Sequence, residues 1–357
     1  MNSFIYNALP SRVVFGAGSL AHLEREIDLL GAKRALVLST PEQAGQARAV
    51  ADRLGGRAAG IYARAVMHVP IETAREARDL ARRLNADCAI AIGGGSTTCL
   101  GKAIALESDL AILAIPTTYA GSEMTPIYGI TEAGLKRTGK STRVLPRAVI
   151  YDPELTRTLP VALTVTSAMN AIAHAAEGLY AQNGNPVMSL MAEEGIRALA
   201  EALPTVREHA DDAAARSDAL YGAWLCGAVL GAVGMALHHK LCHTLGGSFN
   251  LPHAEVHTVV LPHVIAFNAS AAPHAADRIN RALGRKGGSA AAGLFDLAQS
   301  NGAPIALKDI GMRSDDLDAA SELAVSNPYW NPRPIGRAQR GEIRELLQRA
   351  FEGVRPE

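Results

Sequence analysis

The chain has 357 residues, of which 48% are hydrophobic and 20% charged, and its 35 Lys and Arg balance its 35 Asp and Glu. A chain without net charge lacks the basic field on which nucleic-acid and membrane-surface binding depend, so we expect neither partner. The length suits about two domains of ordinary size. Four cysteines without a CxxC pair are too few for a disulfide scaffold, and no signal peptide is evident, which predicts a cytoplasmic protein.

The first part of the chain alternates short apolar runs with amphipathic stretches. Short apolar runs are typical of buried parallel strands, whereas residues 70–86 carry Ala and Leu at helical spacing. Strands that alternate with helices predict βαβ units and a parallel sheet covered on both faces. The expected strands are 12–18, 34–39, 88–93, 110–116 and 148–152.

After Asp152 the sequence becomes rich in Ala and Leu, which predicts helices. We therefore expect an α/β dinucleotide-binding domain over residues 1–157 and an all-α domain over 158–357. Residues 220–237 carry no charge and could span a membrane by length, but they are rich in Gly and Ala and lead into the polar HHKLCH, so we expect a core helix. The expected helical segments are 161–182, 186–209, 213–247, 274–284, 289–301 and 336–352.

Two turns that follow apolar strands have the composition of a cofactor site. Gly94, Gly95 and Ser96 come directly after strand 88–93, where glycines let the backbone approach a phosphate and the next helix offers free N–H groups. Glycine also serves tight turns that bind nothing, so this motif alone is weak. Thr117 and Thr118 follow strand 110–116 and suit hydrogen bonds to a ribose or a nicotinamide amide. The pair of turns predicts a dinucleotide crevice.

Histidines gather in the helical half at paired spacings. His239 and His243 are four residues apart, as are Asn170 and His174, so each pair lies on one helix face. His253 follows a Gly-Gly break at 246–247 that we expect to reverse the chain. A lone helical histidine is usually a core or surface residue, but several at paired spacing beside an apolar segment indicate a site that could bind a metal or one ligand.

Several motifs, in their order along the chain, resemble the iron-containing alcohol dehydrogenase superfamily: GGGS, PTTYAGSE, DPELTRTLP, NAIAHAAE and HHKLCHTLGGSFNLPHAEVHTVVLPHVIAFN. The resemblance implies the dehydroquinate synthase-like fold, with an active site in the cleft between an α/β domain and a helical domain. Members usually hold a divalent metal through one Asp and three His. His174, His239 and His253 match the three histidines, but Asn170 stands at the Asp position.

The Asn170 substitution removes the one anionic ligand, which should weaken the binding of a hard cation. With this change the chain resembles the maleylacetate reductase branch, which is regarded as metal-independent. That resemblance implies reduction of the carbon–carbon double bond of maleylacetate to 3-oxoadipate, in the degradation of aromatic compounds, with NADH or NADPH and with no metal. It also implies a homodimer, for which residues 4–15 are a candidate contact.

The implied reaction adds hydride to a carbon–carbon double bond and builds negative charge on the ketone oxygen, so the site needs an oxyanion partner and a proton donor. We assign these roles to His243 and His253. Asn170, His174 and His239 are expected to orient the dicarboxylate substrate. Lys140 and Arg143, within 136–143, are candidates for carboxylate or cofactor-phosphate contacts, although a solvated basic loop explains them equally well.

Cofactor choice depends on the end of strand 34–39, where NAD-specific members often carry an Asp. Ser39 and Thr40 occupy that place, with Glu42 slightly beyond, so we expect both NADH and NADPH to be used. Two other interpretations stay open: a metal-dependent alcohol or polyol dehydrogenase of the same superfamily, and a non-catalytic dinucleotide-binding protein. The retained histidines count against the second.

Overall fold

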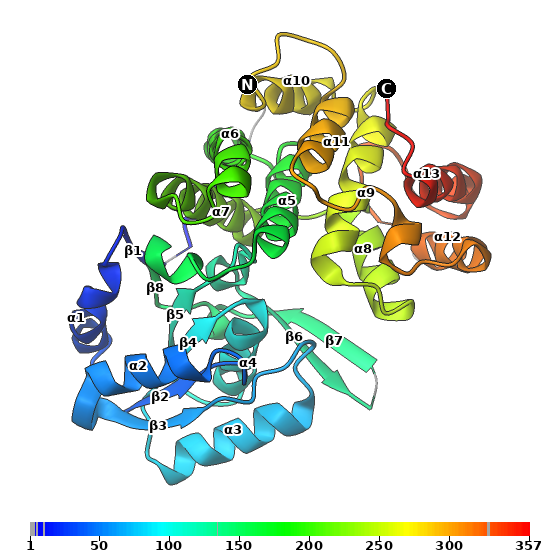
Figure 1. Ribbon diagram of the computed structural model, residues 1–357. Coiled ribbons are helices and arrows are strands. Elements are labelled where there is room, and N and C mark those ends of the chain that lie inside the picture. Colours follow the sequence, from blue (N-terminus) through cyan, green and yellow to red (C-terminus); the bar gives the residue numbers. More distant parts are fainter. Residues whose placement is uncertain (1–3, 5, 10, 134, 327–328) are drawn as a thin grey trace. The chain divides into compact units, whose positions relative to one another are not determined.

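The computed structural model describes residues 4, 6–9, 11–133, 135–326 and 329–357, and their contacts divide the chain into two compact units (Figure 1). One unit is Ala8–Leu159 and the other is built mainly of Pro160–Glu357. The division between 159 and 160 is close to the boundary expected between 157 and 158. The described residues before Ala8 group with the helical unit, although the sequence placed them with the α/β unit.

The α/β unit contains a six-stranded sheet with the strand order β1-β8-β5-β4-β2-β3, and every neighbouring pair is parallel. The five expected strands are confirmed, whereas β3 was not expected, because its residues AAGIY lack a continuous apolar run and are mostly half-buried. The candidate contact segment 4–15 is a strand only from Arg12 among its described residues. The strands are β1 (Arg12–Phe15), β2 (Ala35–Leu38), β3 (Ala58–Tyr62), β4 (Cys88–Gly93), β5 (Ala111–Pro116) and β8 (Ala148–Tyr151).

Helices cover both faces of this sheet, as Figure 1 shows. Val37 packs with α1 and α2 on one face, while Leu36 and Leu38 pack with α3 and α4 on the other. Since successive side chains of a strand point to opposite faces, a strand covered on both sides must be apolar throughout, which explains its unbroken run. The helices are α1 (Leu23–Leu29), α2 (Ala44–Leu54), α3 (Ile71–Arg83) and α4 (Gly95–Leu106).

A two-stranded antiparallel hairpin, β6 (Ile127–Glu132) and β7 (Leu135–Lys140), follows the turn after β5. The expectation of a basic loop over 136–143 is therefore wrong for residues 136–140. Tyr128 and Ile130 alternate along β6 and pack against the α3 and α4 cluster. This period of two is the signal of a strand, and the basic residues that suggested a loop belong to β7, which pairs with β6.

The second unit is helical, as expected, and α5 (Val161–Gly178) is buried along almost its whole length. Helices α6 and α7 approach closely, because a Cβ on Gly195 would lie 2.8 Å from Cys226 Sγ and only glycine leaves that space. Helices α9 and α12 were not among the expected helical segments. The other helices are α6 (Pro186–Glu208), α7 (Ala213–Ala232), α8 (Leu237–Ser248), α9 (His253–Asn268), α10 (Pro273–Ala282), α11 (Ala290–Ser300), α12 (Leu317–Val325) and α13 (Arg340–Glu352).

The expected continuous segment 213–247 is broken between α7 and α8, which are bent by 97° relative to each other. The Gly-Gly pair at 246–247 does not reverse the chain, because it continues α8. The reversal comes after it, near Asn250, whose φ of 54° is left-handed. Within the described ranges no single helix is both long and apolar enough to cross a membrane.

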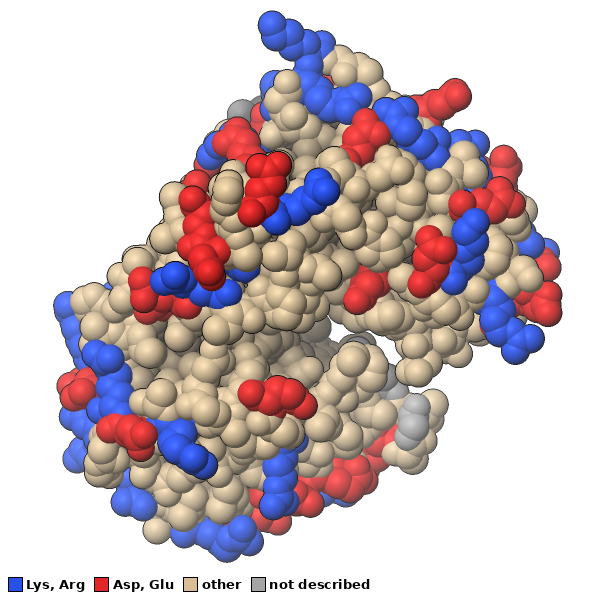
Figure 2. All heavy atoms as spheres, in the orientation of Figure 1, with Lys and Arg blue, Asp and Glu red and all other residues tan. Residues whose placement is uncertain are grey.

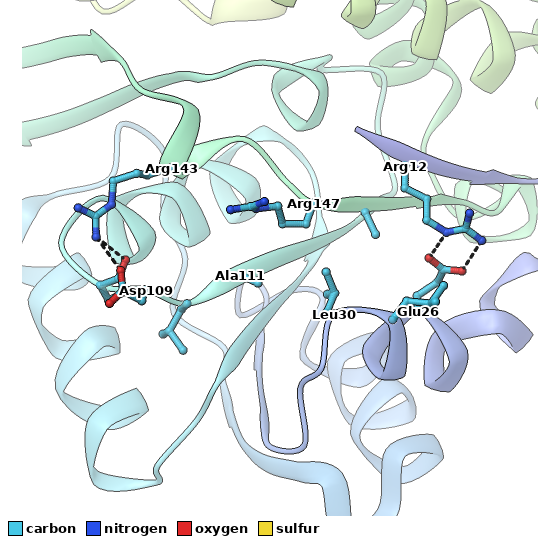
Figure 3. Close-up of a pocket in the computed structure, with 11 residues that line it drawn as sticks. Arg12, Glu26, Leu30, Asp109, Ala111, Arg143 and Arg147 are labelled. Atoms are coloured by element: carbon cyan, nitrogen blue, oxygen red, sulfur yellow. Dashed lines mark hydrogen bonds and ion pairs between the residues drawn. The ribbon is translucent and has the colours of Figure 1, made fainter. Parts of the chain in front are cut away.

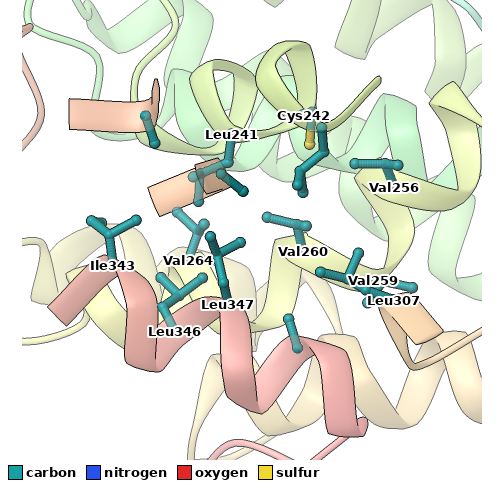
Figure 4. Close-up of a cluster of buried hydrophobic side chains, with 14 of the residues drawn as sticks. Leu241, Cys242, Val256, Val259, Val260, Val264, Leu307, Ile343, Leu346 and Leu347 are labelled. Atoms are coloured by element: carbon teal, nitrogen blue, oxygen red, sulfur yellow. The ribbon is translucent and has the colours of Figure 1, made fainter. Parts of the chain in front are cut away.

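An apolar cluster joins α8 to α9, α12 and α13 (Figure 4). Leu241 and Leu245 face this cluster from α8, and Val260 faces it from α9. On a helix, residues 239 and 243 lie on the side opposite to 241 and 245. Packing of the leucines therefore directs the two histidines away from this apolar core.

Charged side chains of both signs are interspersed over the face shown in Figure 2, in keeping with a chain of zero net charge. Many of them form exposed ion pairs, such as Arg281 with Glu193 at 2.9 Å between Nε and Oε1. Exposed pairs of this kind contribute little to stability.

Candidate active site

The sheet has a topological switch point between β2 and β4. Strand β2 is followed by β3 on one side, while β4 is followed by β5 on the other. Ligands of open α/β sheets bind outside the carboxyl ends of the strands at such a point. The turns after β2, β4 and β5, which carry the expected cofactor residues, all lie at this carboxyl edge.

The glycine turn after β4 packs directly against the turn after β5. A Cβ on Gly94 would lie 3.1 Å from Thr118 Cγ2, and one on Gly95 would lie 3.3 Å from Ala120 Cβ. Helix α4 begins at Gly95, and no side chain caps its first N–H groups. Close backbone approach and uncapped N–H groups are what a phosphate needs, and Ser96 lies in this first helical turn.

Backbone and side-chain bonds hold the turn after β5 beside the other two turns. Thr117 N donates to Gly93 O at 3.0 Å, and Gln43 Nε2 donates to Thr117 Oγ1 at 2.7 Å. Gln43 follows β2, and its Oε1 would lie 2.5 Å from a Cβ on Gly93. Sequence reasoning missed Gln43, because nothing local shows that it reaches two neighbouring strand ends.

The end of β2 contains an acid beside the expected ribose position. Ser39 is buried, and its hydroxyl donates a hydrogen bond to Thr40 O at 3.0 Å. Its side chain therefore stabilises the turn after β2. Glu42 accepts hydrogen bonds from its own backbone N–H and from the Thr40 hydroxyl, which lower its pKa. The ionised Glu42 carboxylate therefore lies next to the Thr40 side chain, closer to the expected ribose position than its place in the sequence suggested.

A buried lysine, Lys102, ties α4 to the turn after β5. Its ammonium donates to Ser122 O at 2.6 Å, to Thr125 O at 2.8 Å and to Ile127 O at 2.8 Å, and also to Thr125 Oγ1 at 2.9 Å. Burial lowers the pKa of Lys102 to about 8. One charged group thus fixes the turn between β5 and β6, and sequence reasoning did not find it.

Arg143 lies at the opposite, amino edge of the sheet. It pairs with Asp109 at 2.9 Å, beside a pocket of about 560 Å³ that Ala111 and Ala148 also line (Figure 3). Arg143 shortly precedes β8, and a residue just before a parallel strand lies at the amino edge by necessity. The cofactor-phosphate interpretation of Arg143 does not agree with this placement. Lys140 is exposed at the end of β7, opposite Ile127.

In the helical unit, α5 presents Asn170, His174 and Glu177 at spacings of four and three residues, hence on one face. All three side chains are buried. Sequence reasoning named the first two and missed Glu177, although its spacing from His174 was visible. The helix therefore carries a carboxylate on this face, but two turns away from the Asn170 position.

Glu177 caps the start of α8 from another helix. Its carboxylate accepts the N–H groups of Ala236 at 2.9 Å, His238 at 2.7 Å and His239 at 3.3 Å, and also Nδ1–H of His239 at 2.7 Å. Burial alone would raise the pKa of Glu177, but these hydrogen bonds outweigh it and lower the pKa to about 2. The bond to Nδ1 fixes the orientation of the His239 ring and leaves its Nε2 without a partner among the described residues.

Six imidazoles form one cluster from α5, α8 and α9. The ring centroids of His174 and His239 are 5.1 Å apart, and those of His243 and His253 are 6.4 Å apart with nearly parallel planes. His257 contributes a buried ring 4.4 Å from His253 and 5.0 Å from His239. The cluster consists of His174, His238, His239, His243, His253 and His257.

The cluster has an exposed side and a buried side. His243 and His253 are exposed, whereas His174, His238 and His257 are buried. Burial, and then the neighbouring imidazoles, lower the pKa of His174 and His257 well below the ordinary value, and burial lowers that of His238 to about 3. These three rings are neutral at neutral pH. Sequence reasoning missed the buried ring His257, although it lies four residues after His253.

Buried polar atoms without a hydrogen-bond partner converge in this cluster. Among the described residues, Asn170 Oδ1, His174 Nδ1, His239 Nε2 and His257 Nε2 have none. Buried polar groups are nearly always paired, and leaving one unpaired costs about 1–3 kcal/mol. Four such atoms together therefore indicate a place for a polar ligand.

The expected metal position offers only neutral donors. Asn170, His174, His239 and His253 supply an amide and three imidazoles, and the nearby Glu177 is already engaged by N–H groups. Among the described residues, three donor atoms lie within 4.8 Å of one another in a different set, His238, Cys242 and His257. The set at the expected position does not fit the hard divalent cation that a carboxylate-containing set would hold.

Comparisons with known proteins agree with this architecture. A family model described as iron-containing alcohol dehydrogenase matches residues 10–153, and its C-terminal counterpart matches residues 164–351. The chain is 64% identical to a maleylacetate reductase from Burkholderia cepacia over 356 residues, covering 100% of both chains, and 56% identical to one from Sphingobium indicum, covering 99% of both. A crystal structure of maleylacetate reductase from Agrobacterium tumefaciens, 57% identical, superposes with a TM-score of 0.96 over 100% of both chains.

Proposed function

This chain belongs to the iron-containing alcohol dehydrogenase family, and from that premise we propose that it reduces the carbon–carbon double bond of maleylacetate to give 3-oxoadipate. The family consists of NAD(P)-dependent oxidoreductases. Full-length relatives at 50–64% identity carry the name maleylacetate reductase, which supports this substrate. The observation that carries the proposal within the chain is the cluster of imidazoles beside Asn170, where a carboxylate in place of the Asn170 amide would repel a dicarboxylate substrate.

The reaction balances with one hydride and one proton. The nicotinamide cofactor supplies the hydride when bound, and the hydride adds to the alkene carbon β to the ketone. The electron pair of the alkene forms a new double bond between the α carbon and the ketone carbon, the carbonyl electron pair moves onto the oxygen to give an enolate, and a proton added at the α carbon restores the ketone. Within the cluster, His243 and His253 are the exposed rings, which suits contact with substrate and proton exchange with water.

The buried residues of the cluster orient the substrate in this proposal. Asn170 Oδ1 and His239 Nε2 lack partners among the described residues, and Glu177 holds the His239 ring in place. His174 packs against the His239 ring on the same side. Lys140 stays a candidate for a substrate carboxylate on charge alone, whereas Arg143, at the amino edge and paired with Asp109, does not.

We propose that the reaction needs no metal, because the matching positions lack an anionic donor. The test measures NADH and NADPH oxidation by maleylacetate with and without a chelator, together with the metal content of the purified protein. Oxidation that a chelator leaves unchanged supports the proposal. A stoichiometric metal, with activity lost on chelation, would favour a metal-dependent alcohol dehydrogenase instead, and no oxidation of either cofactor would contradict the substrate assignment.

The variant Asn170→Asp sharpens this test. It restores a carboxylate one helical turn from His174, so the variant should bind a divalent metal that the parent does not. Its activity on maleylacetate should fall, because the added negative charge repels the substrate. Asn170→Ser is the matched control, since it changes the same side chain without adding charge. Equal metal content in Asn170→Asp and Asn170→Ser would contradict this account of the metal position.

Three further expectations accompany the proposed activity. Both NADH and NADPH should serve, with Glu42 as the group that disfavours the 2′-phosphate. The protein should be a homodimer, and the position of β1 at the end of the strand order gives it an edge for a partner chain; light scattering measures the mass directly. A reducing, cytoplasmic environment suits the four cysteines, all of which carry free thiols.

A further inference from the structure

We propose that His257 is a further catalytic residue of this reaction and that its Nε2–H donates a hydrogen bond to the developing enolate oxygen. This inference rests on the proposed function, because the enolate belongs to that reaction. His257 lies in the middle of the imidazole cluster, with ring centroids at 4.4 Å to His253, 4.8 Å to His238 and 5.0 Å to His239. Its side chain is completely buried.

The two ring nitrogens of His257 have different surroundings. Nδ1 lies 3.0 Å from Nε2 of His238, so one of these two atoms carries the proton of a hydrogen bond. Nε2 has no hydrogen-bond partner among the described residues. The bond at Nδ1 fixes the ring, and the unpartnered Nε2 is left for a ligand. The direction of the bond at Nδ1 decides whether Nε2 donates or accepts.

That direction follows from the surroundings of His238. Cys242 Sγ lies 3.9 Å from its Nδ1 and 3.5 Å from its Nε2, Nδ1 has no other partner among the described residues, and Cys242 lies in the apolar cluster of Figure 4. A thiol is a weak donor and a weak acceptor. When a substrate oxygen accepts a hydrogen bond from Nε2 of His257, a proton on Nε2 of His238 leaves no buried N–H of these two rings without a partner, whereas a proton on Nδ1 of His238 would have only a sulfur atom to bond. With substrate bound, His238 is therefore protonated on Nε2.

With His238 protonated on Nε2, the hydrogen bonds run in one direction. Nε2–H of His238 donates to Nδ1 of His257, and the neutral His257 ring carries its proton on Nε2. A preorganised N–H donor aimed at the place where charge develops is the usual means of stabilising an oxyanion.

The cluster needs such a donor. Of the other unpartnered buried atoms, Asn170 Oδ1 is an amide oxygen that can only accept, whereas His174 Nδ1 and His239 Nε2 are ring nitrogens that can donate or accept. An acceptor cannot stabilise an enolate. Of the ring nitrogens, His257 Nε2 is the one whose proton is set by a hydrogen bond from another imidazole.

The tautomer can be measured without any activity. We suggest selective ¹⁵N labelling of the histidine rings of the full chain, with His257→Gln to assign its signals. The expected result is a protonated Nε2 and an unprotonated Nδ1 for His257 in the parent with 3-oxoadipate bound. The reverse pattern would overturn the proposal. Stoichiometric zinc in the parent that disappears in Cys242→Ala would also overturn it, because His238 and His257 would then be ligands of a metal.

Activity supplies the second test. His257→Phe keeps the volume of a ring but has no donor, so kcat should fall about 10²–10³-fold while the Kd of NADH stays unchanged. His257→Gln, whose amide N–H can donate, should recover part of the loss. The matched controls are His263→Phe and His263→Gln, at a buried histidine on the same helix outside the cluster, and they should keep the parental kcat.

The outcomes separate this inference from the proposed function. If the parent reduces maleylacetate and His257→Phe keeps its kcat, the role of His257 is wrong and the proposed function stands. If the parent does not reduce maleylacetate, the proposed function fails, and with it the enolate role of His257. If His257→Phe does not fold, the tautomer in the parent and the kcat of His257→Gln decide.

Discussion

The carboxyl edge of the sheet and the imidazole cluster differ in whether their polar side chains have hydrogen-bond partners within the chain. At the sheet edge, Gln43 pairs with Thr117, and the Lys102 ammonium has four acceptors. In the cluster, buried atoms such as Asn170 Oδ1 and His239 Nε2 lack partners. The edge offers mostly backbone groups, although the buried hydroxyls of Thr97 and Thr98 in α4 also lack partners among the described residues, whereas the cluster buries ring nitrogens and an amide oxygen at a cost that a ligand can offset.

This difference assigns a separate role to each region: cofactor binding to the sheet edge, and the chemical step to the imidazole cluster. The sheet edge offers backbone groups and side chains that mostly have hydrogen-bond partners already, so it recognises the shape of the cofactor. A change there should alter cofactor affinity. A site made of unpartnered imidazoles acts on a developing charge, so a change there should alter kcat. The predictions below test that division, beginning with the largest effect.

Removing either exposed imidazole of the cluster, His243 or His253, should cause the largest loss of kcat. His243→Ala and His253→Ala should each lower kcat by about 10²–10⁴-fold, the usual effect of removing a positioned acid–base group, without changing the Kd of NADH. Steady-state kinetics and NADH fluorescence titration measure the two quantities. His274→Ala, at an exposed histidine of α10, serves as the control. Near-normal kcat in both cluster variants would place the chemistry elsewhere.

The buried imidazoles should make the protein sensitive to acid. His174, His238 and His257 have pKa values below the ordinary value of about 6.5, so the unfolded chain binds more protons below that pH and the free energy of unfolding falls as pH decreases. Each contributes on the order of 1 kcal/mol per pH unit between its unfolded and folded pKa values.

Urea unfolding at pH 7.5, 6.0 and 5.0 measures this loss. His257→Gln should show a shallower dependence on pH than the parent, because one titrating group is gone. Glu177 acts at lower pH: its folded pKa of about 2 lies below its ordinary value, so its contribution is complete above about pH 4.5 and is lost as pH falls toward 2. An unfolding free energy that does not change between pH 7.5 and 5.0 would show that these rings are not buried and neutral.

At the sheet edge, removing the Lys102 ammonium should weaken cofactor binding. Lys102→Met leaves Ser122 O, Thr125 O and Ile127 O without their donor, so the turn beside Thr118 loosens. The Kd of NADH should rise about tenfold, which corresponds to about 1.4 kcal/mol, while kcat at saturating cofactor changes little. Lys33→Met, at an exposed lysine, is the control. A large loss of kcat with unchanged Kd would break the division between the two regions.

The smallest expected effect concerns cofactor choice. Thr40→Asp adds a second carboxylate beside Glu42, so the ratio of kcat/KM for NADH to that for NADPH should rise several-fold by repulsion of the 2′-phosphate. Glu42→Gln removes the existing carboxylate and should shift the ratio in the opposite direction. If neither variant changes the ratio, the adenosine ribose does not bind at the end of β2.

What the sequence determined by itself was local. Apolar runs located five strands of the sheet, glycines marked the turn that begins α4, and spacings of four residues placed His174 with Asn170 and His243 with His239. Each of these features repeats with the period of one strand or one helix, so it can be read within a few residues. The placement of Arg143 at the amino edge could also have been derived, because it shortly precedes a parallel strand.

Contacts between distant residues decided the rest. The break before α8 arises because Glu177, 59 residues before Ala236, accepts the first N–H groups of that helix. The position of His257 in the cluster depends on a bond to His238 on a different helix. Buried polar partners far apart in the chain leave no periodic signal, since the pairing depends on how the helices pack. Only the tertiary structure therefore shows which imidazoles are held and which face a ligand.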